Sequence, residues 1–441
     1  MKLSPQEYNA ELLAFLQASP TPYHAVSEMA RQLESAGFKR LNEGEVWHTE
    51  AGGRYFCTRS DASILAWTLP KTASLEESGF RMVGAHTDSP CLKVKPNPAL
   101  SVKGYSSLGV EVYGGVLLNP WFDRDLSLAG RVVYENTQGD LKTALVDFKK
   151  PIAVIPSLAI HLDREANAGR AINAQTYLPP ILGQEGKLDF NEALAEQLTA
   201  QGVMDIATNA EGKRCVIDYD MSFYDCQAPS IVGLNDDFIC SARLDNLLSC
   251  FIGLKALVEA GSNEACLLVS NDHEEVGSAS AAGAQGPMLA NLLERLVPNN
   301  EARVRMINRS MMISADNAHG IHPNFSQMHD GNHGPILNEG PVIKVNANQR
   351  YATSSDTSAI FKQVAARAGV DIQSFVVRSD MACGSTIGPI TASAIGVKTL
   401  DVGVPQFAMH SIRETAGSRD AYKLSEILEG FYQLPELPYT Y

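Results

Sequence analysis

Short apolar segments alternate with helical segments along much of this chain, and this alternation constrains the fold more than any other feature. Five apolar segments have the length of a strand: RMVGAHT (81–87), ACLLVSN (265–271), MMISAD (311–316), VIKVNAN (342–348) and KTLDVGV (398–404). Segments 241–261 and 354–369 have the character of helices, and the first carries apolar residues at helical spacing. Strands that are apolar throughout are typical of a parallel sheet buried on both faces. We therefore predict an α/β fold with a mostly parallel sheet flanked by helices.

Residues 93–234 have a different pattern. Turn signals such as KPNPAL and ENTQGD separate short β-branched runs such as RVVYEN and TALVDF. A chain of 441 residues is also longer than one ordinary domain. We predict that 93–234 form a β-rich domain inserted into a domain made of 1–92 and 235–441.

Charge and composition exclude several classes of protein. The chain has 36 Lys and Arg against 50 Asp and Glu, a net charge of −14. This balance argues against a nucleic-acid binder and against a polybasic membrane anchor. The N-terminus lacks a signal-peptide pattern, and no apolar run is long enough to span a membrane. The eight cysteines show no CxxC spacing, so we expect reduced thiols in a cytoplasmic protein.

Polar residues follow several of the predicted strands at their carboxyl ends, where open α/β sheets bind ligands. His86 and Asp88 lie two residues apart and would face the same way on an extended segment. Glu274 and Glu275 are adjacent and would point to opposite sides, so one could ligate a metal while the other acts as a general base. Each pair, taken alone, is also compatible with an ordinary surface turn after a strand.

Other candidates in the sequence leave alternatives open. Asp245, in the first turn of the helix at 241–261, could bridge two metals or simply favour the helix dipole. Asp316 ends an apolar strand, and His319 and His322 follow it as rival ligands. His410 follows the last predicted strand by a few residues.

The combined pattern resembles the aspartyl aminopeptidase family of cytosolic dinuclear zinc metallopeptidases. The resembling segments are SPTPYHAV (19–26), GAHTDSP (84–90), RLDNL (243–247), HEEVGS (273–278), SADNAHGIHPN (314–324), GPVIKVNANQRYATS (340–354), CGSTIGPI (383–390) and VGVPQFAMHSIRE (402–414). The resemblance implies a zinc-peptidase/phosphorylase-like catalytic domain and an inserted domain for dimerisation. It also implies two divalent ions, zinc in the first place, although mixed nitrogen and oxygen ligands would accept manganese or cobalt.

The resemblance assigns roles to individual residues. The implied metal ligands are His86, Asp245, Glu275, Asp316 and His410, with Asp245 shared by the two ions. Glu274 would be the general base for a metal-activated water, and Asp88 would orient the site around His86. The implied substrate contacts are Lys344, Tyr351, Met381, Gly384 and His161. Lys344 would suit an acidic first residue by charge pairing, and His161 would reach the active site of a neighbouring subunit.

The expected activity is removal of N-terminal residues, preferably Asp or Glu, from peptides with a free N-terminus. The resemblance further implies a homo-oligomer, in which dimers assemble into a dodecamer. One alternative is a broad-specificity aminopeptidase or a related amidohydrolase, such as a deacetylase, on the same fold. A catalytically silent assembly protein would be expected to have lost ligands or the base, whereas all six of those positions are intact.

Overall fold

The computed structural model describes residues 3–184, 188–261 and 263–438, and the chain folds into two compact units. Unit 1 comprises the described residues of 1–89, 229–409 and 414–441, and unit 2 comprises those of 90–228 and 410–413. Each unit has its own hydrophobic core and is described separately.

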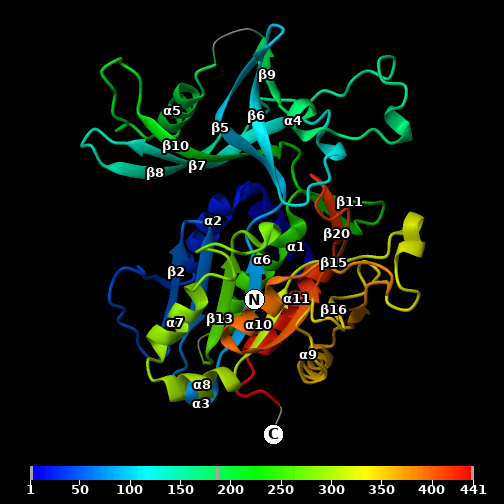
Figure 1. Ribbon diagram of the computed structural model, residues 1–441. Helices are drawn as coiled ribbons and strands as arrows, with labels where there is room; N and C mark the ends of the chain where they lie inside the picture. The colour runs from blue at the N-terminus through cyan, green and yellow to red at the C-terminus, as the bar shows by residue number, and fades with distance from the viewer. Residues whose placement is uncertain (1–2, 185–187, 262, 439–441) are drawn as a thin grey trace. The chain divides into compact units, whose positions relative to one another are not determined.

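The main sheet of unit 1 has nine strands within the described residues (Figure 1). Their order is β1 (Lys39–Arg40), β2 (Arg54–Arg59), β3 (Ser63–Thr68), β13 (Cys266–Asn271), β4 (Arg81–His86), β14 (Met311–Ala315), β18 (Lys398–Gly403), β16 (Val342–Lys344) and β17 (Gln373–Phe375). The four central strands β13, β4, β14 and β18 are parallel neighbours, while β3 runs antiparallel to β2 and β13, and β16 runs antiparallel to β18. The predicted α/β fold with a mainly parallel sheet is confirmed.

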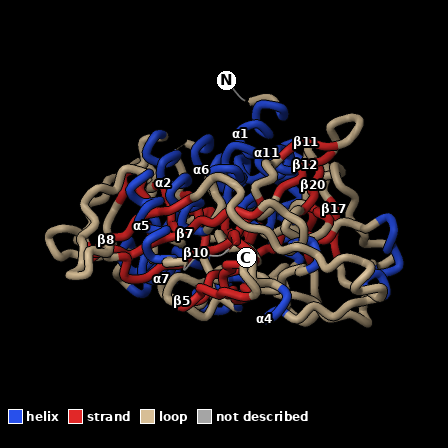
Figure 2. Tube along the Cα trace, turned by 90° about the horizontal axis from the view of Figure 1, so that it is seen from above, coloured by secondary structure: helices blue, strands red, loops and turns tan. Residues whose placement is uncertain are grey.

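Helices cover both faces of this sheet. One face packs against α1 (Pro5–Ala18), α2 (Pro22–Ser35), α6 (Leu244–Ala260), α9 (Ser355–Ala368) and α11 (Asp420–Tyr432). The other face packs against α7 (Met288–Leu296), α8 (Asn300–Asn308) and α10 (Ile387–Ile395), with the short α3 (Leu75–Ser78) beside α8. Successive residues of a strand point to opposite faces of the sheet. In β13, Leu268 packs in the core beneath α1, α2, α6, α9 and α11, and Leu267 packs in the core on the other face. Helices α1, α6 and α11 lie side by side (Figure 2).

A smaller sheet completes unit 1. Its strands, in order, are β11 (Ser230–Val232), β12 (Phe238–Ser241), β20 (Glu414–Gly417), β19 (Pro405–Phe407) and β15 (Ala318–His319). The chain leaves β14 and β18 of the main sheet and enters β15 and β19 of this one within a few residues. The turns that join the two sheets therefore start at the carboxyl ends of the central strands.

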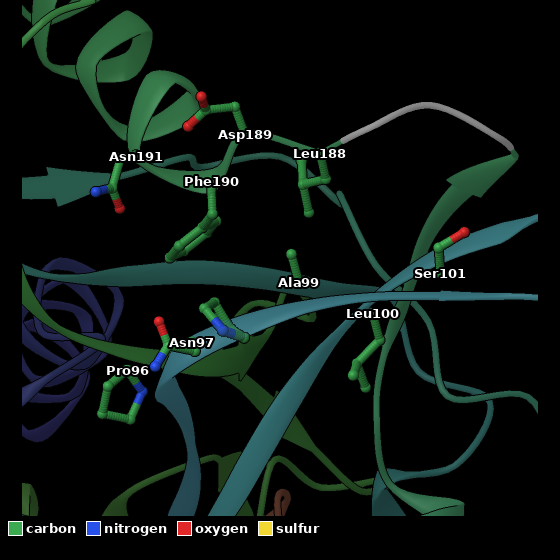
Figure 3. A pocket seen from close by; sticks show the side chains of 10 residues that line it. Pro96, Asn97, Ala99, Leu100, Ser101, Leu188, Asp189, Phe190 and Asn191 are labelled. Atoms are coloured by element: carbon green, nitrogen blue, oxygen red, sulfur yellow. The ribbon is translucent and has the colours of Figure 1, made fainter.

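Unit 2 is built around an antiparallel sheet. The strand order is β8 (Leu141–Asp147), β7 (Leu126–Glu135), β10 (Val216–Asp225), β5 (Cys91–Val102), β6 (Tyr105–Tyr113) and β9 (Ile181–Gln184). Helices α4 (Ala174–Tyr177) and α5 (Phe190–Ala200) pack against it. A cavity of about 820 Å³ lies between residues 96–101 of β5 and residues 188–191 around the start of α5, where the Leu188 and Phe190 side chains point toward the strand (Figure 3).

Two predicted elements differ from the structure in their bounds. The strand expected at 342–348 ends at Lys344, because the residues after it form turns. In these turns the Asn346 side chain accepts the N–H groups of Asn348 at 2.9 Å and Arg350 at 3.5 Å. The helix expected from 241 begins at Leu244, and its second and third residues have non-helical backbone angles.

Crossing a bilayer requires a helix of about 20 mostly apolar residues. None of the described helices combines the length and the apolarity that crossing requires.

Candidate functional site

The ends of three parallel strands bring the predicted site residues of unit 1 together. β4 ends at His86, its neighbour β13 ends at Asn271, and β14 on its other side is followed by Asp316. Asn271 pairs in register with His86, so the segments that follow β4 and β13 start side by side. The site therefore lies at the carboxyl edge of the sheet, where the sequence pattern placed it.

His86 is at the centre of the cluster and is buried. Its Nε2 lies 3.4 Å from Asp245 Oδ1, 3.5 Å from Asp316 Oδ1 and 4.0 Å from Glu274 Oε2. Its Nδ1 lies 3.0 Å from the Asp88 carbonyl oxygen and 3.3 Å from Asp88 Oδ1. The ring is thus held through Nδ1, and Nε2 faces the carboxylates.

Asp88 organises the two glutamates as well as the histidine. Its Oδ1 accepts the Glu274 N–H at 3.1 Å, and its Oδ2 accepts the Glu275 N–H at 3.1 Å. The extended backbone expected for this pair of glutamates is wrong, because His273 adopts a positive φ of 65° and residues Glu274–Val276 form a 3₁₀ turn. One carboxylate can bind two consecutive N–H groups because the turn points them in the same direction.

Asp245 lies in an irregular turn rather than in the regular first turn expected for the helix. Its N–H donates to Glu414 Oε2 at 3.0 Å, and its carbonyl oxygen accepts the Ser89 hydroxyl at 2.5 Å. Asn246 donates to the Ala315 carbonyl oxygen at 2.9 Å, which ties the turn to the end of β14. These contacts fix the backbone that carries the Asp245 carboxylate.

Burial and crowding of charge shift the pKa values of the cluster. Burial, together with the nearby Asp316, Asp245 and Asp88 carboxylates, raises the pKa of Glu274 to about 7. His86 acts in the opposite direction but is outweighed. Burial, together with Asp245, also raises the pKa of Glu275 well above its usual value. For His86, burial alone would lower the pKa, but hydrogen bonds to three aspartates outweigh it and raise the pKa.

These donors fit a divalent metal. Ligand atoms of His86, Asp245 and Asp316 lie within 4.8 Å of one another, and the same holds for His86, Glu274 and Glu275. One imidazole among buried carboxylates is a donor set that suits zinc and also manganese.

His410 belongs to segment 410–413 and is described with unit 2. Its backbone adopts a positive φ of 68°. Its Nδ1 lies 3.0 Å from the Gly115 carbonyl oxygen, and its own carbonyl oxygen accepts the Leu117 N–H at 3.1 Å. The ring is oriented through Nδ1, so the ligand atom it would offer is Nε2.

Lys344 is buried and its ammonium is already paired. It donates to Asp316 Oδ2 at 3.1 Å and to the Asn317 carbonyl oxygen at 3.2 Å, and it lies 5.0 Å from the centre of the Tyr351 ring. Burial would raise the pKa of Asp316, but Lys344 and His86 together lower it. Lys344 therefore keeps Asp316 ionised and in place.

A cavity of about 290 Å³ in unit 1 contains another predicted substrate contact, Met381. This cavity is also lined by His319 and His322, which the sequence offered as rival metal ligands. Neither residue belongs to a group of side chains that could hold a metal ion among the described residues. Gly384 lies outside the cavity lining, and a Cβ there would meet nothing within 4 Å. His161 is exposed on a turn of unit 2.

The structure adds supporting residues that sequence reasoning missed. Glu414 is buried and holds the Asp245 N–H, while Gln406 accepts a hydrogen bond from the Asn317 side chain at 2.7 Å. Both lie within the segment 402–414 that carried the resemblance, but no local spacing distinguishes them from ordinary polar residues. Their membership in that segment was the only available signal.

An α/β sheet with an imidazole and several carboxylates gathered at its carboxyl edge defines the class of metallohydrolases. Comparison with known proteins narrows this class. The model of the aminopeptidase I zinc metalloprotease family (M18) matches residues 15–432. A probable M18 family aminopeptidase 2 of Ectopseudomonas mendocina is 60% identical over 430 residues, which cover 97% of this chain and 98% of the relative.

Solved structures agree with this comparison. The mApe1 structure from Chaetomium thermophilum has a TM-score of 0.87 at 28% identity and covers 99% of this chain and 100% of its own. The mApe1 dodecamer of S. cerevisiae has a TM-score of 0.82 at 28% identity and covers 97% of this chain and 96% of its own. The chain belongs to the M18 family of zinc metalloproteases and is a peptide-bond hydrolase of the aminopeptidase type.

Proposed function

We propose that this aminopeptidase removes N-terminal residues, preferably Asp or Glu, from peptides by means of a metal-activated water. The observation that carries the proposal is the gathering of Asp245, Asp316 and Glu274 around His86 at the sheet edge. A site with both donors for a cation and an adjacent carboxylate of raised pKa suits general-base hydrolysis.

The proposed ligands divide into two sets that share one residue. His86, Asp245 and Asp316 would hold one ion, and Asp245, Glu275 and His410 would hold the other. When bound, the ions would polarise the scissile carbonyl and lower the pKa of the attacking water. Asp88 would keep the 3₁₀ turn of the two glutamates in place, because its carboxylate accepts the N–H groups of Glu274 and Glu275.

Glu274 is the proposed general base. Its carboxylate would take the proton from the water and later deliver it to the leaving amine. The free α-amino group of the peptide would pair with carboxylates of the site, which fixes cleavage at the first peptide bond.

The acidic preference would come from the cavity that contains Met381. Its described lining includes Arg378, which pairs with Asp380, and no carboxylate, while burial lowers the pKa of His319 and His329 and favours their neutral forms. Lys344 and Tyr351, beside Asp316, would contribute further positive potential and shape. An acidic side chain is the one that such a lining favours.

The proposed working form is a homo-oligomer of dimers, up to a dodecamer. Unit 2 would be the oligomerisation domain, and the remainder of the chain would be the catalytic domain. His161 would reach the active site of a neighbouring subunit, and the exposed side chains beside it, Ile160 and Leu162, suit burial in such an interface.

A panel of aminoacyl anilides on zinc-reconstituted protein tests the proposal. We expect the highest kcat/KM for the Asp and Glu anilides and no cleavage of N-acetyl-Asp anilide, which lacks the free amine. Equal rates across the panel would instead support a broad-specificity aminopeptidase, and cleavage of the acetylated compound would support a related amidohydrolase.

The Glu274→Gln variant tests the mechanism. Because the amide keeps the shape of the side chain but cannot accept the proton, we expect kcat to fall about 100-fold or more. Elemental analysis should show the same metal content as the wild type. Wild-type turnover in this variant would contradict the role of Glu274.

A further inference from the structure

Asp401 is a fully buried carboxylate that the proposed mechanism does not use. It lies on the central strand β18, beside Ser314 of β14. A carboxylate in such a place must be compensated by hydrogen bonds, because burial without partners is costly. The partners of Asp401 show what it does.

Two segments that carry proposed substrate contacts meet at this carboxylate: 350–354, the Tyr351 segment, and 381–388, the Met381 segment. Asp401 Oδ2 accepts the Ala352 N–H at 2.6 Å, next to Tyr351. Asp401 Oδ1 accepts the Thr386 hydroxyl at 2.6 Å, at the end of the segment that carries Met381. The Asp401 N–H also donates to Thr353 Oγ1 at 3.1 Å.

The same two segments also contact each other directly. Arg350 Nε donates to the Cys383 carbonyl oxygen at 3.1 Å, and the Ser385 hydroxyl donates to the Arg350 carbonyl oxygen at 3.3 Å. Both Arg350 and Ser385 are exposed, so these outer contacts compete with water. The buried contacts of Asp401 are therefore the stronger link.

The Asp401 carboxylate packs closely against the first turn of α10. A Cβ added at Gly388, in the first turn of α10, would lie 2.5 Å from both carboxylate oxygens of Asp401. The position of Asp401 is thus fixed against the start of α10, and Thr386 immediately precedes that helix. A negative charge there is favourable to the helix dipole.

We propose that Asp401 is a positioning residue that holds the Tyr351 segment and the Met381 segment in one relative arrangement and thereby sets which first residue the cavity accepts. Asp401 acts through Ala352 and Thr386 and does not touch the substrate. The inference rests on the proposed function for the identity of the substrate, but the link between the two segments is independent of it.

The Asp401→Asn variant tests this inference. An amide accepts through only one of its two polar atoms, so one of the two links is replaced by an unfavourable or reoriented contact. We expect faster hydrogen–deuterium exchange at 350–354 and 383–388 and thiol labelling of Cys383 about 5-fold faster than in the wild type, since both report local opening. We also expect a higher KM for the Asp anilide and a smaller ratio of Asp to Leu cleavage, with unchanged metal content and a smaller change in kcat.

Asp420→Asn is the matched control. Asp420 is equally buried and accepts the N–H groups of Asn338 at 2.6 Å and Gly340 at 2.9 Å, but these contacts involve neither substrate segment. Its variant should lose thermal stability without a change in the Asp-to-Leu ratio or in Cys383 labelling. If Asp401→Asn does not fold, Thr386→Val removes one link alone and replaces it in the test.

The outcomes separate the inference from the proposed function. Unchanged exchange and labelling in Asp401→Asn, or an equal change in the Asp420→Asn control, would overturn the inference. Faster exchange and faster Cys383 labelling in Asp401→Asn, with an unchanged KM and an unchanged ratio of Asp to Leu cleavage, would also overturn it. A wild-type enzyme without acidic preference would overturn that part of the proposed function, while exchange, labelling and KM would still decide the role of Asp401.

Discussion

Individual residues of the metal-free site bind more protons in the folded chain than in the unfolded chain. Burial raises the pKa of Glu274 from 4.5 to about 7, and the pKa values of Glu275 and His86 are raised as well. A shift of this size for Glu274 corresponds to roughly 3 kcal/mol at most. The lowered pKa of Asp316 contributes stability that is fully present at neutral pH and is lost only as pH falls below its usual value of 3.8, so it adds no slope near neutral pH.

The first prediction concerns the pH dependence of stability. A raised folded-state pKa gives stability that is present below the unfolded pKa and lost as pH rises through the folded pKa. We therefore expect the thermal midpoint of the metal-free protein to fall as pH rises from about 6 to about 8, around the folded-state pKa of Glu274. Scanning calorimetry after chelation measures it, with metal-loaded protein and metal-free Glu274→Gln as controls that should show a smaller slope. A midpoint that rises over this range would contradict the prediction.

At the scale of helices and strands, Arg81 links the start of β4 to the C-terminal segment. Its buried guanidinium donates to the carbonyl oxygens of Leu434 at 3.0 Å, Pro435 at 2.6 Å and Ser78 at 2.8 Å. This fork of donors satisfies several carbonyl groups at once in a fixed planar geometry that a lysine lacks. The strand that ends at His86 is thus fixed at its other end.

The second prediction is that Arg81→Lys lowers stability without affecting the site. We expect a loss of about 2–4 kcal/mol, because buried carbonyl groups lose their donors. The kcat of folded enzyme should stay near the wild-type value, since β4 separates Arg81 from His86 by about 16 Å. Urea unfolding compares this variant with Arg309→Lys, whose exposed arginine donates to the Glu76 carbonyl oxygen at 2.7 Å. Equal midpoints for the two variants would refute the role of Arg81.

The sequence predicted the central strands of the main sheet well, because a strand that is buried on both faces is apolar along nearly its whole length. The segments at 81–87, 265–271, 311–316 and 398–404 correspond to β4, β13, β14 and β18. The rule that ligands bind at the carboxyl ends of such strands then brought His86, Glu274 and Asp316 together. This part of the prediction needed only periodicity and strand direction.

Local conformation and distant pairing were not predictable in the same way. The 3₁₀ turn at Glu274 depends on a positive φ at His273, which is uncommon for a residue other than glycine. Lys344 pairs with Asp316, which lies 28 residues away in the sequence, and no local pattern reveals such a pair. From the sequence alone, the Lys344 charge was therefore interpreted as a free contact for the substrate. Asp401 gave no signal because an aspartate within an apolar strand does not reveal its partners.

At the scale of the whole molecule, exposed apolar side chains in unit 2 raise the question of assembly. Leu158, Ile160 and Leu162 are 51%, 47% and 75% exposed in the same short segment as His161. Side chains of this kind, gathered in one segment, are typical of a protein–protein interface. The dodecameric S. cerevisiae structure, which covers 97% of this chain, shows that the fold can assemble.

The last prediction is that Leu162→Asp disrupts the oligomer. A charge buried in an apolar interface without a partner is strongly unfavourable, so we expect a lower sedimentation coefficient than that of the wild type. Val46→Asp is the matched control, because Val46 is 82% exposed in unit 1 and lies outside the proposed interface. If His161 serves a neighbouring active site, Leu162→Asp should also lose activity, whereas His161→Ala should lose activity and remain assembled. An unchanged sedimentation coefficient for Leu162→Asp would remove segment 158–162 from the interface, and full activity of assembled His161→Ala would remove His161 from the neighbouring site.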